Sequence, residues 1–288
     1  MKKRQIGRTE LEVNEVGYGA MHLSIDREKR PSDVESIALI QRAVDELGVD
    51  FIDTADAYCI NEEEKGHNER LIARALQGER RGRVVIATKG GHKRPKGRWE
   101  RNGRPEYLRA ACEASLKALE ADHIDLYQFH APDPNVPVEE SIGTLVDLQR
   151  EGKIRHIGIS NFSLAMLKHI MADAEIVSVQ NRYSVMDRRE QDEIVDFCEQ
   201  QEITYIPWNP VGGRGNAPEI GQMFGALGEI GTAHGVAPHT IALAWLLGRS
   251  PIMLPIPGTR KFDHLAENMK APDIELTSDE IERLNSIG

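Results

Sequence analysis

Short apolar runs alternate with amphipathic segments from about residue 14 onward. Most runs are continuously apolar, which is typical of strands that face helices on one side and a barrel interior on the other. Eight such runs predict a closed parallel barrel, since an open doubly wound sheet usually has fewer strands. The predicted strands are 13–19, 49–53, 84–89, 123–130, 154–160, 175–180, 203–208 and 251–257.

Segments with helical periodicity separate these runs. From Ser32 to Gly48, apolar residues recur at steps of three and four, Ser32 and Glu35 can form a capping box, and the glycine ends the helix. Pro105 opens another helix, because proline is favoured at the first helical position. Further helices are predicted at about 68–77, 138–151, 163–171, 188–201 and 219–248.

The pattern predicts an α/β fold, namely a single-domain (β/α)8 TIM barrel over residues 1–288. Two end segments are expected to add to this barrel. Residues 4–13 are expected to form a β-hairpin that caps the N-terminal mouth of the barrel. Residues 277–287 are expected to form a C-terminal helix with a capping box of Thr277 and Glu280. Active sites of such barrels lie at the C-terminal ends of the strands, so residues there are the first candidates for function.

Composition and charge fit a soluble globular protein, with 40% hydrophobic and 28% charged residues. The longest apolar stretches are too short to span a membrane, and no apolar signal-peptide core follows the basic start, so we predict a cytoplasmic protein. The net charge of −10 opposes binding to nucleic acid or acidic membranes. We expect a small molecule as the partner, and a monomer or weak homo-oligomer.

The cysteines and histidines do not indicate a metal site. Three scattered cysteines provide neither a disulfide framework nor zinc-ligand spacing, and no histidine pair has helical metal spacing with a third ligand. We therefore predict no metal. Cys59 is interpreted as a residue that lines a pocket rather than as a nucleophile, because no base is evident beside it.

Three ionisable side chains end three consecutive predicted strands: Asp53, Lys89 and His130, with Tyr58 in the loop after Asp53. Each has an ordinary structural interpretation alone, but together they would meet at one barrel mouth. A nearby ammonium lowers the pKa of a tyrosine, which is about 10 when unperturbed. Lys89 can supply that charge, Asp53 can orient Lys89, and His130 can orient a carbonyl oxygen. The set suits proton donation during reduction of a carbonyl group.

Four sequence blocks resemble the signature blocks of the aldo-keto reductase superfamily, in that family's order: FIDTADAY, VVIATKGG, LYQFH and IRHIGISNF. The resemblance runs from about Val13 to Asn268. It implies a (β/α)8 barrel that reduces aldehydes or ketones with NADPH in preference to NADH. By motif position it implies a catalytic tetrad of Asp53, Tyr58, Lys89 and His130, with Tyr58 as the proton donor.

The resemblance also implies the cofactor contacts. Ser160, Asn161 and Gln180 would hold the nicotinamide carboxamide, and Trp208 would stack against the ring. Residues 257–269 match the site for the adenosine 2′-phosphate, although His264 stands where many members carry an arginine. The full implied set is Gly19, Ala20, Met21, Asp53, Ser160, Asn161, Gln180, Trp208, Asn209, Pro210, Gly212, Gly258, Thr259, Arg260, His264, Glu267 and Asn268.

Within this set, Gly258 and Thr259 are expected to open a short helix whose N–H groups suit an anion. Arg260 would pair with the phosphate or stack on adenine. Glu267 and Asn268 match positions that bind the adenine amino group.

His22 occupies the place of the third glycine of a dinucleotide fingerprint, which disfavours a Rossmann domain.

The expected substrate pocket comprises Met21, His22, Tyr58, Cys59, Trp99 and His130. The basic loop 90–104 should overhang it, and could meet an anionic substrate, grip the cofactor pyrophosphate or be merely solvated. The glycine-rich segment 212–215 is a hypothetical loop that closes over the pyrophosphate.

Two other functions stay open at this point. A slow-turnover, NADPH-binding redox-sensor subunit would keep the same cofactor site, although no membrane-facing extension is evident. A barrel isomerase or lyase would instead use Lys89 as a Schiff base.

Overall fold

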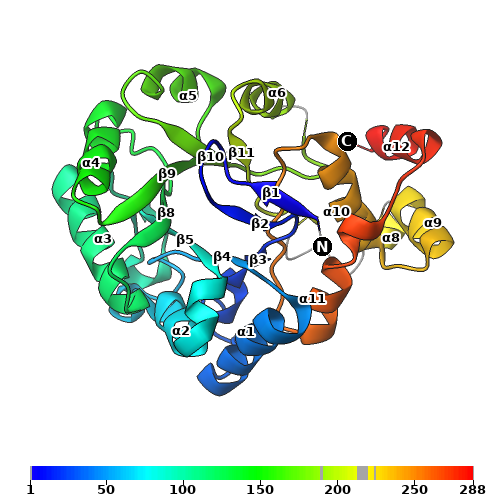
Figure 1. Cartoon of the computed structure of the whole chain (residues 1–288), viewed down its shortest axis with the longest axis horizontal. Coiled ribbons are helices and arrows are strands. Elements are labelled where there is room, and N and C mark those ends of the chain that lie inside the picture. Colours follow the sequence, from blue (N-terminus) through cyan, green and yellow to red (C-terminus); the bar gives the residue numbers. More distant parts are fainter. Residues whose placement is uncertain (1, 189–190, 213–219, 224, 288) are drawn as a thin grey trace.

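The computed structural model describes residues 2–188, 191–212, 220–223 and 225–287. Within them, a parallel seven-stranded sheet in the order β11-β10-β9-β8-β5-β4-β3 curls inside a ring of helices (Figure 1). The predicted barrel architecture is confirmed. Its strands are β3 (Tyr18–Gly19), β4 (Phe51–Asp53), β5 (Val85–Gly90), β8 (Ile124–Phe129), β9 (Ile154–Ser160), β10 (Ile176–Gln180) and β11 (Thr204–Tyr205).

The helices follow the predicted periodicity with small shifts at their ends. Around the sheet lie α1 (Asp33–Leu47), α2 (His67–Ala75), α3 (Pro105–Leu119), α4 (Val138–Arg150), α5 (Leu164–Ile170), α6 (Asp192–Gln200), α8 (Ile220–Met223), α9 (Gly225–His234), α10 (Pro238–Arg249), α11 (Phe262–Asn268) and α12 (Ser278–Asn285). The capping box of α1 and its left-handed Gly48, with φ of 65°, are present as expected. No helix in the described ranges is long and apolar enough to cross a lipid bilayer.

The single helix predicted at 219–248 is wrong, because the chain forms α8, α9 and α10 there. Residues 235–237 separate α9 from α10, which begins at Pro238. Proline can start a helix but cannot continue one, since it has no N–H and its ring clashes with the preceding turn.

The eighth predicted strand, 251–257, is also wrong as a strand. Leu254 donates its N–H to Tyr205 at 2.9 Å, and Gly17 and Gly19 donate theirs to the carbonyls of Pro255 and Pro257 at 3.0 and 3.2 Å. Prolines cannot donate to a ladder, so regular pairing stops. The segment lies between β11 and β3 and is joined to them by separate hydrogen bonds, so regular strand pairing does not fully close the predicted barrel in the described residues.

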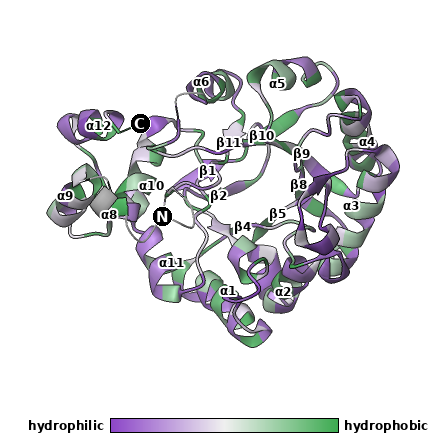
Figure 2. Cartoon of the chain, turned by 180° about the vertical axis from the view of Figure 1, so that it is seen from behind, coloured by the Kyte–Doolittle hydropathy of each residue, from purple (hydrophilic) through white to green (hydrophobic). Residues whose placement is uncertain are grey.

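Apolar side chains form two clusters, one inside the curled sheet and one between the sheet and its helices. The inner cluster includes Phe51, Leu126 and Val177, with Ile6 and Val13 packed against them. The last two belong to the hairpin of β1 (Lys3–Gln5) and β2 (Glu12–Asn14) and its loop. The hairpin therefore plugs the N-terminal mouth, as predicted. In Figure 2 the outer helices carry both hydrophobic and hydrophilic residues, as expected for helices that cover a sheet.

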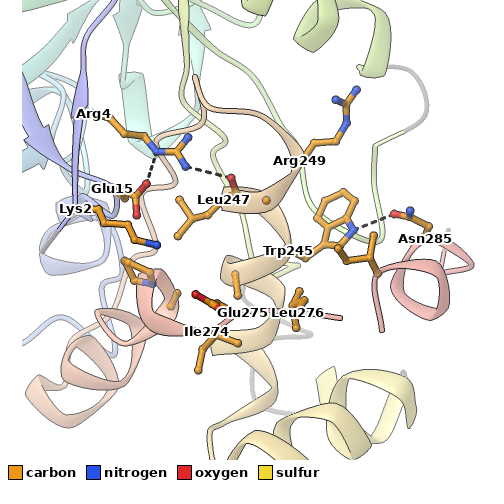
Figure 3. A pocket seen from close by; sticks show the side chains of 15 residues that line it. Lys2, Arg4, Glu15, Trp245, Leu247, Arg249, Ile274, Glu275, Leu276 and Asn285 are labelled. Atoms are coloured by element: carbon orange, nitrogen blue, oxygen red, sulfur yellow. Dashed lines mark hydrogen bonds and ion pairs between the residues drawn. The ribbon is translucent and has the colours of Figure 1, made fainter. Parts of the chain in front are cut away.

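A groove of about 460 Å³ lies beside the hairpin, between α10 and the segment 271–276 (Figure 3). Arg4 crosses it and donates to Glu15 at 3.0 Å and to the Leu247 carbonyl at 3.1 Å. None of the candidate strand-end residues lines this groove. Asp53 and Lys89 lie instead at the opposite, C-terminal end of the strands, and His130 directly follows β8 there.

Candidate active site

The four predicted catalytic side chains meet at the C-terminal mouth of the barrel. Lys89 Nζ donates to Asp53 Oδ1 at 2.6 Å, to the Thr54 carbonyl at 2.7 Å and to the Tyr58 hydroxyl at 3.1 Å. The rings of Tyr58 and His130 are in edge-to-face contact, with centroids 5.9 Å apart. The parallel register aligns the strand ends, and this alignment brings residues distant in sequence together.

A pair of glutamines holds the second oxygen of the Asp53 carboxylate. Gln180 Nε2 donates to Asp53 Oδ2 at 2.7 Å and to Gln128 Oε1 at 3.2 Å, while Gln128 Nε2 reaches the same carboxylate oxygen at 3.3 Å. Sequence reasoning missed Gln128, although a polar residue inside the apolar strand LYQFH is a signal for it. Gln180 thus has a bond to the carboxylate that the family resemblance did not imply.

Burial controls the protonation of the buried Tyr58–Lys89 pair. It raises the pKa of the Tyr58 phenol well above its ordinary value of 10.0, and the Asp53 carboxylate adds to this rise. Burial also lowers the pKa of the Lys89 amine, which Asp53 opposes. The expectation of a lowered Tyr58 pKa is therefore wrong, because desolvation of the phenolate and the neighbouring Asp53 carboxylate both raise it. Tyr58 keeps its proton at neutral pH.

An aromatic wall extends from Tyr58 and His130 through His92 to Trp99. His130 contacts His92 at a centroid distance of 4.3 Å and Trp99 at 5.8 Å, and Trp99 is 6.5 Å from Tyr58. His92 begins the hairpin of β6 (His92–Lys93) and β7 (Glu100–Arg101), which forms part of the basic loop. Sequence reasoning missed His92, because its place depends on how this loop folds back over the mouth.

Both histidines of this wall are neutral at physiological pH. Burial lowers the pKa of His92 to about 4. It lowers the pKa of His130 well below its usual range, with the nearby Lys89 ammonium acting in the same direction. A neutral imidazole still has one N–H to donate, so His130 can give a hydrogen bond to an oxygen without adding a charge.

The basic loop 90–104 is not solvated along its whole length, because the side chain of Arg94 is buried. The Arg94 guanidinium stacks over the Trp99 ring at 4.0 Å and donates to the carbonyls of Ala57 and Gly97 at 3.4 and 3.0 Å. Trp99 remains 45% exposed. Arg94 thus supports one face of the indole and leaves the rest accessible at the mouth.

Two of the residues implied for the nicotinamide lie next to the tetrad. Asn161, with φ of 62°, donates from Nδ2 to the His130 carbonyl at 2.9 Å and to Ser160 Oγ at 3.0 Å. Trp208 Nε1 donates to Asn161 Oδ1 at 3.2 Å. These bonds connect the ends of β8 and β9 to the segment that follows β11.

The loop after β3 packs against the segment that contains Gly258. A Cβ on Gly258 would lie 2.8 Å from His22 Cδ2 and 3.0 Å from the Gly19 carbonyl oxygen, so a larger residue would not fit without movement. Ala20 and Met21 belong to the short helix η1 (Ala20–Leu23) beside them. The two loops therefore form one continuous edge of the mouth.

The structure contradicts the helix start predicted at Gly258, whereas the surroundings of Cys59 agree with the interpretation that it is not a nucleophile. The helix α11 begins at Phe262, and Lys261, the residue before it, has an extended backbone. Gly258 and Thr259 therefore do not open a helix. Cys59 is fully buried, and burial raises the pKa of its thiol to about 12, which opposes a nucleophilic role.

The segment after Trp208 turns where the cofactor-binding residues Asn209, Pro210 and Gly212 are predicted. Gly212 donates its N–H to the Asn209 carbonyl at 3.1 Å. Residues 213–215 of the hypothetical closing loop lie outside the described residues.

A cavity of about 690 Å³ lies beside the segment implied for the adenosine 2′-phosphate. Arg260 is not among the lining residues of this cavity; it donates to the Lys29 carbonyl at 2.6 Å and lies 3.7 Å from Asp26. Glu267 Oε1 accepts the Ala237 N–H at 3.0 Å. The cavity lining includes Val211, Pro238, His239, Gly258, Thr259, His264 and Asn268.

Comparisons with known proteins agree with this fold. The sequence model of the aldo/keto reductase family matches residues 15–288. An uncharacterised oxidoreductase of Schizosaccharomyces pombe is 35% identical over 288 residues, which cover 97% of this chain and 88% of that protein. A thermostable aldo-keto reductase in complex with the inhibitor epalrestat has a TM-score of 0.84 and 31% identity, with 100% of both chains covered. An aldo/keto reductase from Klebsiella pneumoniae in complex with NADP and acetate has a TM-score of 0.82 over 99% of this chain and 94% of that one, and its 24% identity shows the fold alone.

Proposed function

This chain belongs to the aldo/keto reductase family, and from that premise we propose that it reduces the carbonyl group of an aldehyde or ketone to an alcohol with NADPH. One observation carries the proposal: Lys89 Nζ donates to both the Tyr58 hydroxyl at 3.1 Å and Asp53 at 2.6 Å, and all three side chains are buried. A phenol, an ammonium and a carboxylate in contact suit general-acid catalysis.

Proton delivery in this proposal uses only groups of the chain. The bound nicotinamide supplies the hydride. Tyr58 gives its phenolic proton to the carbonyl oxygen as negative charge develops there, and the resulting phenolate is stabilised by the hydrogen bond from Lys89. Asp53 keeps Lys89 charged and in place. His130, as a neutral imidazole, donates a hydrogen bond that orients the carbonyl oxygen.

The residues near the mouth fit a dinucleotide. Gly258 allows close approach of the two loops, and the cavity of about 690 Å³ begins beside it. Asn161 and Trp208 would lie against the nicotinamide end, and Thr259 and Asn268 against the adenosine end. The choice of NADPH over NADH rests on the resemblance of residues 257–269 to a site for the adenosine 2′-phosphate.

The substrate would lie above Tyr58 and His130, with Trp99 as one wall and Met21 and His22 opposite. A Schiff-base role for Lys89 has less support, because its amine already donates three hydrogen bonds within the protein. The proposal therefore needs no covalent intermediate on the chain.

A fluorescence titration with NADPH and NADH, followed by a panel of aldehydes and ketones, tests this function. We expect tight NADPH binding, and NADPH oxidation matched one to one by alcohol formed over many turnovers. Tight NADPH binding with no steady turnover on any carbonyl would instead identify a redox-sensor subunit. Failure to bind either nucleotide would refute both functions.

A further inference from the structure

The hairpin of β6 and β7 turns one face toward the catalytic tetrad. His92 and Arg101 are directly opposite each other in this antiparallel pair, so their side chains lie on the same face. Trp99 contacts His92 with ring centroids 5.4 Å apart, and the Arg94 guanidinium stacks on Trp99. His92 in turn contacts His130 of the tetrad. Two aromatic rings and two guanidinium groups therefore share the face that borders the proposed substrate position.

Neither guanidinium of this face forms an ion pair with a carboxylate within the described residues. Arg101 donates to the Pro132 carbonyl at 3.2 Å, and Arg94 donates to two backbone carbonyls. The Glu62 carboxylate binds the backbone N–H of Arg94 rather than its guanidinium. Arg94 is buried, and a buried cation is costly unless a negative charge lies nearby. This arrangement indicates that the negative charge comes from outside the chain.

Two buried nitrogen atoms of the same face also lack partners. His92 Nδ1 and Arg94 Nε have no hydrogen-bond partner within the described residues. Buried polar atoms are normally hydrogen-bonded, so these two indicate a site for a polar ligand. Burial lowers the pKa of His92, and the positive charges of Arg101 and Arg94 lower it further. The potential at this face is therefore positive, although the whole chain carries a net charge of −10.

The basic loop 90–104 adds further positive charge around this face. It contains six lysines and arginines and one carboxylate, Glu100, which pairs with Arg98 at 3.0 Å. A mouth lined by one sign of charge attracts ligands of the opposite sign. Exposed charges alone would not define a site, but the buried nitrogen atoms of His92 and Arg94 place one on the inner face of the loop.

We propose that this face of the hairpin receives a carboxylate of the substrate, and that the preferred substrate is an aldehyde or ketone with a flat apolar spacer between its carbonyl and its carboxylate. The carbonyl lies over Tyr58 and His130, and the spacer packs against Trp99. The carboxylate accepts from Arg101, the exposed guanidinium, and Arg94 strengthens this contact through its charge. The inference rests on the proposed function, because it names the substrate class of the same site.

Three para-substituted benzaldehydes test the inference on the full chain with saturating NADPH. They carry a carboxylate, a carboxamide or an amidinium, so the charge changes while the shape is kept. We expect kcat/KM for the carboxylate to exceed that for the carboxamide roughly 10-fold, and the amidinium to be the poorest substrate. The carboxylate withdraws electrons least and leaves its aldehyde the least reactive, so this order cannot come from the carbonyl itself. The preference should shrink to less than about 3-fold between about 0.05 M and about 0.5 M KCl, because salt screens exposed charges.

Variants of Arg101 locate the preference. Arg101→Gln should reduce it to less than about 2-fold through a higher KM for the carboxylate. Arg101→Lys should keep part of it, because the charge remains without the planar fork of the guanidinium. Lys117→Gln is the matched control, since it removes one positive charge from an exposed residue in the last turn of α3. Its preference should equal that of the wild type within about 2-fold.

A wild type that reduces the carboxamide and the carboxylate with equal kcat/KM, or an Arg101→Gln variant that keeps the preference, would overturn the inference. A weaker NADPH affinity in Arg101→Gln with the preference intact would assign the loop to the cofactor pyrophosphate instead. In each of these cases, reduction of the carboxamide keeps the proposed function. If the wild type reduces none of the three aldehydes and none of the wider carbonyl panel, the proposed function fails as well.

Discussion

Lys89 and Tyr58 share a hydrogen bond of 3.1 Å between the amine nitrogen and the phenol oxygen, and both side chains are buried. The amine is the donor, so the phenol proton is free to point elsewhere. A neutral phenol in this place is a weak acid until negative charge develops on a neighbouring oxygen. The bond from Lys89 gains most of its strength when the phenolate forms, and that is the property a proton donor requires.

Replacing Tyr58 with phenylalanine removes the proton and keeps the ring. We expect kcat for carbonyl reduction to fall by about 10²- to 10⁴-fold, the usual contribution of a general acid. The dissociation constant for NADPH should change less than about 2-fold, because only the hydroxyl is lost. Steady-state kinetics and a fluorescence titration measure the two quantities. Near-native kcat in this variant would exclude Tyr58 as the acid.

Lys89→Met tests the charge behind the phenol and should reduce kcat to a similar extent. It should also lower the free energy of unfolding by about 3–5 kcal/mol, because the buried Asp53 carboxylate loses its cation. The double variant Asp53→Asn, Lys89→Met removes both charges and is the matched control. It should recover much of the stability in urea unfolding while activity stays low. A single variant as stable as the wild type would contradict the ion-pair argument.

Glu69→Gln should make stability less dependent on pH. Glu69 is fully buried, and burial raises the pKa of its carboxyl from 4.5 to about 7, with the Asp56 charge acting in the same direction. A raised carboxyl pKa contributes stability that is complete below about pH 4.5 and is lost as the pH rises through about 7. Glutamine stays neutral and keeps the oxygen that accepts from Thr88.

The free energy of unfolding of Glu69→Gln should therefore exceed that of the wild type by roughly 3 kcal/mol above about pH 8. The difference should disappear near pH ~5. Urea unfolding at both pH values measures it. The same advantage at both pH values would show that Glu69 does not titrate in this range.

The sequence predicted the strand ends well because β-strands of one barrel align at one rim. Asp53, Lys89 and His130 needed only that regularity to be placed together. The eighth strand was predicted wrongly, because the missing N–H groups of Pro255 and Pro257 matter more than the apolar pattern. The sign of the Tyr58 pKa shift was also predicted wrongly, since a list of neighbours does not show how completely the phenol is desolvated. His92 and the bond between Gln180 and Asp53 depend on loop geometry and rotamers that periodicity does not encode.

Trp99 is expected to select substrates by the shape of their side group. Its ring is held on one side by Arg94 at 4.0 Å and meets Tyr58 at 6.5 Å, yet it stays 45% exposed. A ring on the substrate could pack against it, and such an aromatic pair contributes about 0.5–1.5 kcal/mol beyond its buried area. Trp99→Ala should therefore raise KM for a benzaldehyde roughly 10-fold.

For a short aliphatic aldehyde, KM in Trp99→Ala should change less than about 2-fold, and kcat should be nearly unchanged for both substrates because the tetrad is intact. Arg94→Met is the matched control: it keeps a long apolar side chain under the indole and removes the charge, so KM for the benzaldehyde should rise by a smaller factor. A contact between Trp99 and the substrate requires that Trp99→Ala raise KM more for the benzaldehyde than for the aliphatic aldehyde. An equal rise in KM for both would mean that Trp99 shapes the loop rather than contacting the substrate.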